Sequence, residues 1–306
     1  MPKQVSIFLN GVTIVDHAYI DDRGNIRGGS FNPGFVVTGE VDSTEKVVVD
    51  FSTVKKTIKR LLDERETGFD HKLWILEGYS QCDKEFDRDR IKINSPGLRL
   101  DIPRNAVKIF KKKQYLLAEI GRSFEDYLNQ KIKAYHPSIK VSCYNSIEPY
   151  SLIMKPELLS YFTYCHGLKN STSWGCQNNS HGHLSFISLL NNGKESKNSR
   201  LLNLQREISK ELDRTIFLWK ENVTSRNNEI VKMEYATRER GYFFAEYKTE
   251  HNKLAILDTE TTIEFLTEYV CEKWNKELEY VGANAIALSE GLAKGGYANL
   301  NDKLQH

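Results

Sequence analysis

The order of predicted elements repeats along the chain, and this repeat constrains the fold more than any other feature. In the first half, hydrophobic periodicity predicts strands and helices at residues 5–20, 34–41, 47–51, 52–64, 124–135 and 141–144. In the second half, it predicts them at residues 159–166, 183–190, 202–212, 241–248, 253–257, 262–278 and 283–288. Each half follows the order β, β, α, then α, β, which indicates an internal duplication in an α+β protein.

The length of the chain agrees with two units. It has 306 residues, about twice the usual size of one domain, although one long domain is also possible at this length. We place the boundary near residues 150–157, which gives units at 1–150 and 151–306. Two charged stretches, residues 84–118 and 220–237, do not fit the repeat and are expected to be peripheral insertions.

Composition narrows the class of protein. Hydrophobic residues make up 40% and charged residues 27% of the chain, as in ordinary globular proteins. The formal net charge is only +2, which gives no reason to expect nucleic acid as a partner. No apolar run is long enough for a membrane span, and the first ten residues lack the core of a signal peptide. Five cysteines without framework spacing indicate reduced thiols, so we expect a cytoplasmic protein.

Three histidines and one cysteine in the second half have the spacing of a metal site. His181 and His183 flank a glycine, so both side chains fall on one face of an extended strand. His166 ends the preceding predicted strand, and a hairpin would bring it beside that pair. Three neutral histidines with one open position are typical of catalytic zinc. Cys176 lies in the connecting loop, where a nearby cation would lower the pKa of its thiol.

Two runs of the second half contain these residues: Tyr161-Phe-Thr-Tyr-Cys-His166 and Trp174-Gly-Cys176-Gln-Asn-Asn-Ser-His181-Gly-His183. They resemble the signature of the 6-pyruvoyltetrahydropterin and 6-carboxytetrahydropterin synthases, in which a strand-end histidine and a catalytic cysteine precede a His-Gly-His zinc pair.

The resemblance continues through the first half in Thr38-Gly-Glu-Val-Asp42, Val47-Val-Val-Asp-Phe51 and Asp70-His71-Lys72. In the family, an Asp-His pair completes a catalytic triad with the cysteine. His17 is expected to correspond to the first metal histidine, but residues 30–35 contain no His-Gly-His triplet, so this half is not expected to bind zinc. In the second half, Asp213-Arg214 stands in place of the Asp-His pair.

What the resemblance implies is one complete site divided between the two halves, because family sites lie between neighbouring subunits. The implied roles are catalytic for Cys176, Asp70 and His71, pterin-anchoring for Glu290, and zinc-binding for His166, His181 and His183. The implied fold is the tunnelling fold, or T-fold, with antiparallel sheets that carry helices on one face and assemble into a barrel. Two fused units would let three chains replace six subunits, so a homotrimer or similar ring is expected.

The implied activity is that of a zinc-dependent synthase or lyase on 7,8-dihydroneopterin triphosphate. We favour the 6-carboxytetrahydropterin branch, which feeds 7-deazaguanine (queuosine-type) synthesis, over the 6-pyruvoyltetrahydropterin branch. A different class also fits the residues, namely a non-catalytic T-fold protein that binds a pterin, purine or nucleotide. Purely structural roles are also possible for these residues. Cys176 would then be an inert loop thiol, Asp70-His71 a helix-end cap with a surface histidine, and Glu290 part of an ordinary turn.

Overall fold

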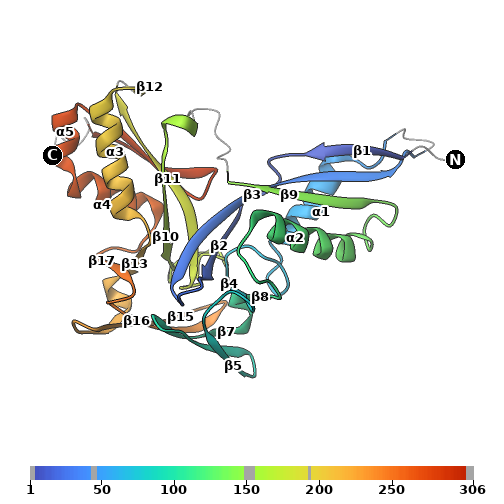
Figure 1. The fold of residues 1–306 in the computed structure, drawn as a ribbon, viewed down its shortest axis with the longest axis horizontal. Helices are drawn as coiled ribbons and strands as arrows, with labels where there is room; N and C mark the ends of the chain where they lie inside the picture. Colours follow the sequence, from blue (N-terminus) through green and yellow to red (C-terminus); the bar gives the residue numbers. More distant parts are fainter. Residues whose placement is uncertain (1–3, 43–46, 148–155, 192–193, 301–306) are drawn as a thin grey trace.

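The computed structural model describes residues 4–42, 47–147, 156–191 and 194–300, which form three sheets and five α-helices (Figure 1). This mixed architecture confirms the α+β class. The predicted boundary near residues 150–157 lies almost wholly outside the described residues. In the part of the chain that is described, no helix is long and apolar enough to cross a membrane.

The first sheet is built from the first half of the chain. It contains β1 (Gln4–Leu9), β2 (Val15–Ile20), β3 (Ile26–Glu40), β4 (Lys72–Leu76), β8 (Val107–Phe110) and β9 (Lys140–Ser146). β3 pairs antiparallel with β1, β2 and β9, whereas β2, β4 and β8 run parallel. The predicted strand 5–20 is therefore two strands, and the predicted strand 34–41 begins already at Ile26.

The second sheet repeats this pattern of pairing. It contains β10 (Ser160–His166), β11 (His181–Asn191), β12 (Lys194–Glu195), β13 (Thr215–Trp219), β17 (Lys253–Leu257), β18 (Ala285–Glu290) and β19 (Lys294–Asn299). β11 pairs antiparallel with β10 and β18, and β10, β13 and β17 run parallel. Antiparallel pairs, as expected, are the more numerous in both sheets, and each sheet also contains two parallel pairs.

The two stretches expected to be peripheral insertions form most of a third sheet together. Its strands are β5 (Asp83–Asp87), β6 (Arg90–Asn94), β7 (Leu98–Pro103), β14 (Val223–Arg226), β15 (Ile230–Thr237) and β16 (Gly241–Lys248). β7 pairs with β16, so this sheet joins the two halves through backbone hydrogen bonds. Its inner side chains, such as Ile93 and Phe243, are fully buried in a core that also contains Leu73 and Ile216. The expectation of peripheral insertions is wrong, because alternate apolar residues on these strands cover one face of both other sheets.

The helices cover other parts of the first two sheets. They are α1 (Phe51–Leu62), α2 (Leu117–Ile132), α3 (Ser199–Leu212), α4 (Ile263–Lys273) and α5 (Asn275–Val281). Asp50, not Ser52, caps α1, and residues 47–49 form a bend where a strand is predicted. α2 begins before Ser123, and the single helix predicted at 262–278 is divided at Trp274.

The β2–β3 hairpin lies against the β10–β11 hairpin at a glycine pair. A Cβ atom on Gly182 would lie 2.8 Å from Gly28 Cα and 2.5 Å from Tyr164 O, so only glycine fits at this crossing. Beside it, Leu184 N donates to Ser30 Oγ at 3.0 Å. The crossing brings the start of β2 next to the histidines of β11.

Candidate active site

Three histidines converge where β10 and β11 meet. His166 ends β10 and pairs with His181 at the start of β11, and His183 follows on the same face. All three side chains are buried, with at most 1% of each residue exposed. One ring nitrogen of each lies within 4.8 Å of the others. The structure thus brings together the three residues that the sequence singles out as metal ligands.

The Nδ1 atom of each imidazole faces an oxygen. The partners are the carbonyl of Thr261 for His166 (2.8 Å), the carbonyl of Asn178 for His181 (2.6 Å) and the carboxylate of Asp16 for His183 (3.3 Å). An oxygen partner places the ring proton on Nδ1 and leaves a lone pair on Nε2. This is the arrangement that orients histidines toward a metal.

The Nε2 atoms therefore point toward one another. His166 Nε2 lies 3.1 Å from His183 Nε2, and His181 Nε2 has no hydrogen-bond partner among the described residues. Burial lowers the pKa of His166 to about 3 and that of His181 well below its usual value, so both are neutral. Buried lone pairs that converge on one point repel each other unless a cation lies between them. The donor set thus fits a metal ion, and three nitrogen ligands are typical of zinc.

Asp70, His71 and Cys176 meet across the two halves. Asp70 Oδ2 lies 2.6 Å from His71 Nδ1, and a ring nitrogen of His71 lies within 4.8 Å of both Cys176 Sγ and a ring nitrogen of His181. Burial alone would lower the pKa of His71, but the Asp70 carboxylate and the Cys176 thiol raise it well above its usual value. Burial alone would raise the pKa of Cys176, but His71 and Ser173 lower it on balance. The pair is poised for proton transfer.

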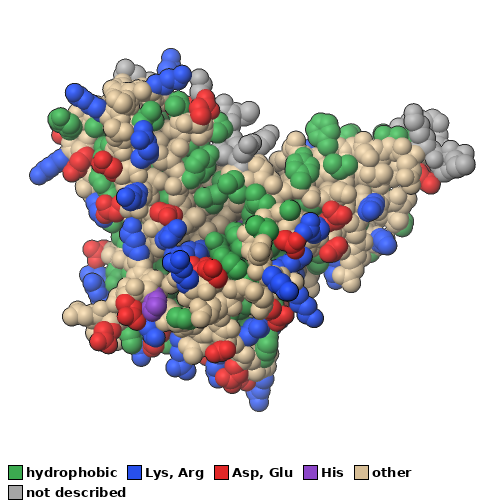
Figure 2. Space-filling model, in the orientation of Figure 1, with side chains coloured by type: hydrophobic (Ala, Val, Ile, Leu, Met, Phe, Trp, Pro, Cys, Tyr) green, Lys and Arg blue, Asp and Glu red, His purple; other side chains and the backbone are tan. Residues whose placement is uncertain are grey.

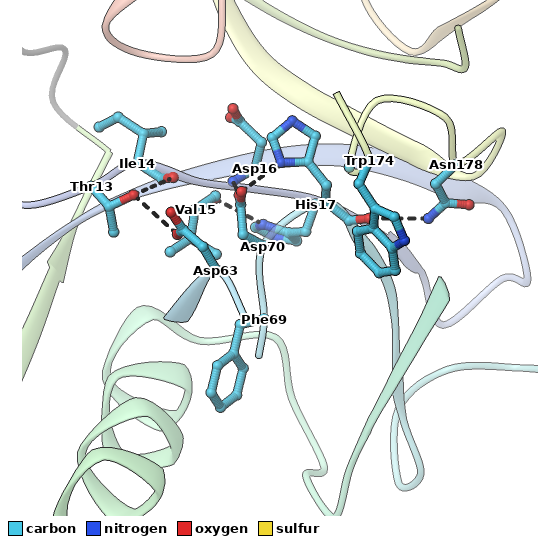
Figure 3. Close-up of polar contacts among 12 residues, drawn as sticks. Thr13, Ile14, Val15, Asp16, His17, Asp63, Phe69, Asp70, Trp174 and Asn178 are labelled. Atoms are coloured by element: carbon cyan, nitrogen blue, oxygen red, sulfur yellow. Dashed lines mark hydrogen bonds and ion pairs between the residues drawn. The ribbon is translucent and has the colours of Figure 1, made fainter. Parts of the chain in front are cut away.

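The loop that carries Cys176 is held by the first half. A Cβ atom on Gly175 would lie 2.7 Å from His71 Cγ, so the loop backbone lies directly against this imidazole. Asn178 Nδ2 donates to the carbonyl oxygens of His71 (3.2 Å) and Ala106 (3.3 Å). Figure 3 shows Asn178 reaching toward the first half, beside Trp174. Residues far apart in sequence thus position the thiol.

Arg240, which lies in the turn between β15 and β16, is a functional candidate that no sequence motif marks. Its Nη1 donates to the carbonyl oxygens of Trp174 (3.1 Å) and Gly175 (3.2 Å), and its guanidinium stacks on the Trp174 ring at 3.8 Å from the ring centroid. Burial lowers its pKa to about 9. Only the pairing of the third sheet brings this turn to the Cys176 loop, so the sequence carries no signal for it.

Asp16 is the second functional candidate that sequence analysis does not identify. Its carboxylate accepts a 2.5 Å hydrogen bond from Ser30 Oγ besides facing His183, while its backbone N donates to Asp70 Oδ1 at 2.9 Å (Figure 3). Burial would raise the pKa of Asp16, but His183 and its other neighbours lower it, so the carboxylate is charged. One residue thus touches both the histidine cluster and the Asp70-His71 pair.

Glu290 lies at the end of β18 beside the histidines. Its Oε1 is 3.8 Å from His166 Nε2 and 4.0 Å from His183 Nε2, and its Oε2 is 2.6 Å from Lys294 Nζ. Burial would raise its pKa, but the two histidines and Lys294 lower it to about 2. Both carboxylate oxygens already face partners, so a bidentate contact with a ligand requires Lys294 to move.

The Asp-His pair has a backbone counterpart in the second half. Two hydrogen bonds tie each dipeptide to a strand: Asp16 N to Asp70 Oδ1 (2.9 Å) and His71 N to Asp16 O (2.6 Å) in the first half, and Thr163 N to Asp213 Oδ1 (2.8 Å) and Arg214 N to Thr163 O (2.7 Å) in the second. His71 and Arg214 also share a left-handed backbone, with φ values of 52° and 61°. Asp213-Arg214 therefore occupies the position expected from the sequence.

The expectation that His17 corresponds to the first metal histidine is wrong. If Asp16 corresponds to Thr163, then Tyr19 corresponds to His166, and the partner of Tyr19 across the hairpin, Arg27, corresponds to His181. The next equivalent position, that of His183, is occupied by Gly29. His17 instead stacks on Trp74 at 3.6 Å between ring centroids and is buried in an aromatic cluster. None of the three equivalent residues is a histidine.

Comparisons with known proteins give limited similarity. No protein-family model matches the chain, and no curated protein matches it. Solved structures of 6-pyruvoyltetrahydropterin synthase from Plasmodium vivax, including catalytic-residue mutants, are 16% identical; the match covers 49% of this chain and 94% of theirs, with a TM-score of 0.39. The synthase from Plasmodium falciparum is 18% identical over 46% of this chain and 90% of its own, with a TM-score of 0.35.

Proposed function

We propose that the chain is a zinc-dependent lyase or synthase that acts on 7,8-dihydroneopterin triphosphate. One observation carries the proposal: Asp70 and His71 from the first half meet Cys176 and the metal-binding histidines of the second half in one buried centre. A thiol, a charged acid–base pair and an open metal position together suit proton transfer on a hydroxylated side chain.

Each residue has a role that its surroundings support. His166, His181 and His183 would hold the zinc, which, when bound, makes substrate hydroxyls easier to deprotonate. Cys176 takes a proton from the substrate side chain as a thiolate, because His71 lowers its pKa. His71 delivers its proton to the substrate side chain, at the position opposite the one from which Cys176 takes a proton. Asp70 keeps the His71 imidazole charged. Glu290 accepts hydrogen bonds from the pterin after its ion pair with Lys294 opens.

We further propose that the product is that of the 6-carboxytetrahydropterin branch, which serves 7-deazaguanine (queuosine-type) synthesis, with 6-pyruvoyltetrahydropterin synthase activity as the alternative. The site residues are common to both branches. The mass of the released pterin product distinguishes them.

The assembly we propose is a ring of three chains, each with two T-fold units at residues 1–150 and 151–306. The repeated strand pairing supports two units. Among the described residues, the strands β8, β9, β17 and β19 each pair with only one neighbour, so both sheets end in free edges. Edges of this kind join when sheets close into a barrel. All five cysteines are free thiols, which suits a cytoplasmic protein.

A non-catalytic protein that binds a pterin, purine or nucleotide is the second candidate. The ion pair of Glu290 with Lys294 bears on both candidates alike, since the proposed pterin anchor is already engaged. The charged His71 beside a thiol of lowered pKa opposes it, because binding alone requires neither group.

The test measures zinc content and turnover of the full chain with 7,8-dihydroneopterin triphosphate. We expect about one zinc per chain, release of triphosphate, and loss of turnover in Cys176→Ala and His71→Ala with zinc retained. Cys82→Ala and His251→Ala serve as matched controls, because neither residue belongs to the centre. Zinc binding without turnover would favour the binding protein, and absence of metal binding would refute the zinc site.

A further inference from the structure

The position on the β2–β3 hairpin that is equivalent to the metal centre on the β10–β11 hairpin is an open cleft. It has a volume of about 470 Å³ and is lined by residues that include Tyr19 and Arg27 from the first half and Thr163 and Arg214 from the second. At the metal centre, residues 167–180 cover the histidines. At the equivalent place, a short turn at residues 21–25 stands instead, so nothing from β2–β3 closes it.

The substitutions change the chemistry of this place. Arg27 stands where the metal centre has His181, and Arg214 stands where it has His71. The metal centre has an imidazole at each of these two positions. In the cleft, both positions carry a guanidinium group, which donates hydrogen bonds and never accepts them. Arg27 and Arg214 therefore present hydrogen-bond donors, whereas His181 at the metal centre presents an acceptor.

Three aspartates line the cleft; Asp22 is exposed, whereas Asp21 and Asp213 are engaged in hydrogen bonds. Asp21 accepts from the backbone N atoms of Arg23 (3.0 Å) and Asn25 (2.8 Å) and from Arg27 Nε (3.0 Å). Asp213 accepts from both the backbone N and the hydroxyl of Thr163 at 2.8 and 2.9 Å. Asp21 thus holds the turn and pairs with Arg27, and Asp213 holds the strand and lies 3.4 Å from Arg214 Nε, so each carboxylate engages only one nitrogen of its arginine.

The guanidinium groups, in contrast, keep free donors. Within the described residues, the Nη atoms of Arg27 and of Arg214 have no hydrogen-bond partner, although each Nε faces an aspartate. Arg27 is held by Asp21 with its side chain 19% exposed, so its fork is fixed and accessible. Figure 2 shows basic side chains gathered beside acidic ones over the region of β2 and β10.

We propose that this cleft is a second ligand site, which binds the oxyanion group of a small phosphorylated or carboxylated molecule between Arg27 and Arg214. The planar guanidinium groups of Arg27 and Arg214 match the geometry of a phosphate or carboxylate, which can accept two hydrogen bonds from one guanidinium group. Tyr19 and Tyr79 line the same cleft and offer aromatic surface to the rest of the molecule. The site is independent of the reaction proposed for the metal centre.

The experiment is isothermal titration calorimetry on the metal-loaded full chain with inorganic tripolyphosphate, phosphate and citrate as probes. We expect one saturable site per chain, with affinity at least about tenfold weaker in Arg27→Gln and in Arg214→Asn. Asparagine tolerates the left-handed backbone at position 214, and this exposed side chain is remote from the core, so that variant keeps the fold. Arg99→Gln, on the third sheet, is the matched control and should bind as the unaltered chain does.

His181→Ala separates this site from the metal centre. Binding that persists in His181→Ala but weakens in both arginine variants supports the cleft, whether the preferred probe is a phosphate or the carboxylate. Binding that disappears in His181→Ala, or that is unchanged in both arginine variants, overturns the proposal. Failure of pterin turnover would refute the proposed reaction and leave this result unaffected.

Discussion

His183 Nδ1 lies 3.3 Å from Asp16 Oδ1, so a carboxylate of the first half faces one of the three histidines of the second half that we propose as metal ligands. The same residue bonds through its backbone to Asp70 and His71. Asp16 thus connects the histidine cluster to the Asp70-His71 pair.

Replacing Asp16 should weaken metal binding. Asp16→Asn keeps the shape but removes the charge that holds the His183 tautomer, so we expect zinc affinity to fall roughly 10- to 100-fold, as for other second-layer partners of metal ligands. Competition with a zinc-binding dye measures it. Asp83→Asn, an exposed aspartate on β5, is the control, and equal affinities in all three proteins would show that Asp16 does not orient His183.

The thiol of Cys176 should react at lower pH than the thiols of Cys82 and Cys143. Its pKa is lowered beside His71, whereas burial raises the pKa of Cys82 to about 11 and that of Cys143 to about 12. A lowered pKa leaves thiolate present as the pH falls, so iodoacetamide should label Cys176 first at neutral pH. Mass spectrometry of labelled peptides from the metal-free chain follows each site.

His71→Ala provides the test of cause. Without the charged imidazole, only the hydrogen bond of Ser173 opposes the effect of burial on Cys176, so its pKa should rise and its labelling at neutral pH should slow about tenfold or more. Labelling of Cys82 should not change. A labelling rate of Cys176 that is the same with and without His71 contradicts the proposed pair.

Arg240→Met should loosen the loop that carries Cys176. The change removes two hydrogen bonds to the carbonyls of Trp174 and Gly175, but it also removes a buried charge whose Nε and Nη2 have no partner among the described residues. We therefore expect faster amide hydrogen exchange at residues 171–180 and reduced turnover, with little change in the free energy of unfolding. Arg238→Met, an exposed position on the same turn, should leave exchange unaltered.

Gly182→Ala should destabilise the crossing of the two hairpins. The new Cβ atom would meet backbone atoms of Tyr164 and Gly28, which cannot rotate away, so we expect a loss of roughly 1–3 kcal/mol or more in the free energy of unfolding. Gly121→Ala in α2 is the matched control: its Cβ atom meets nothing closer than 3.4 Å, and alanine should stabilise that helix by roughly 0.5–1 kcal/mol. Urea unfolding measures both changes, and equal effects would contradict the close approach.

Sequence patterns were informative where a feature is local. The repeat of strands and helices identified the α+β class, because hydrophobic periodicity is set by the residues of one element. The prediction that His166, His181 and His183 share one face also follows from local rules, since a hairpin places strand ends side by side. The predicted ends of helices and strands were wrong where capping competed with periodicity, as at Asp50. They were also wrong where tertiary packing extended a strand, as at Ile26.

What only the tertiary structure decided is how distant segments meet. The charged stretches of both halves form one sheet because β7 and β16 pair, and no local pattern records that partnership. Asp16, Arg240 and the cleft at Arg27 and Arg214 depend on the same long-range placement. The sequence by itself therefore determined which residues are chemically capable of forming a site. The crossing of two hairpins at Gly28 and Gly182, a contact between backbones, determined which of them lie together.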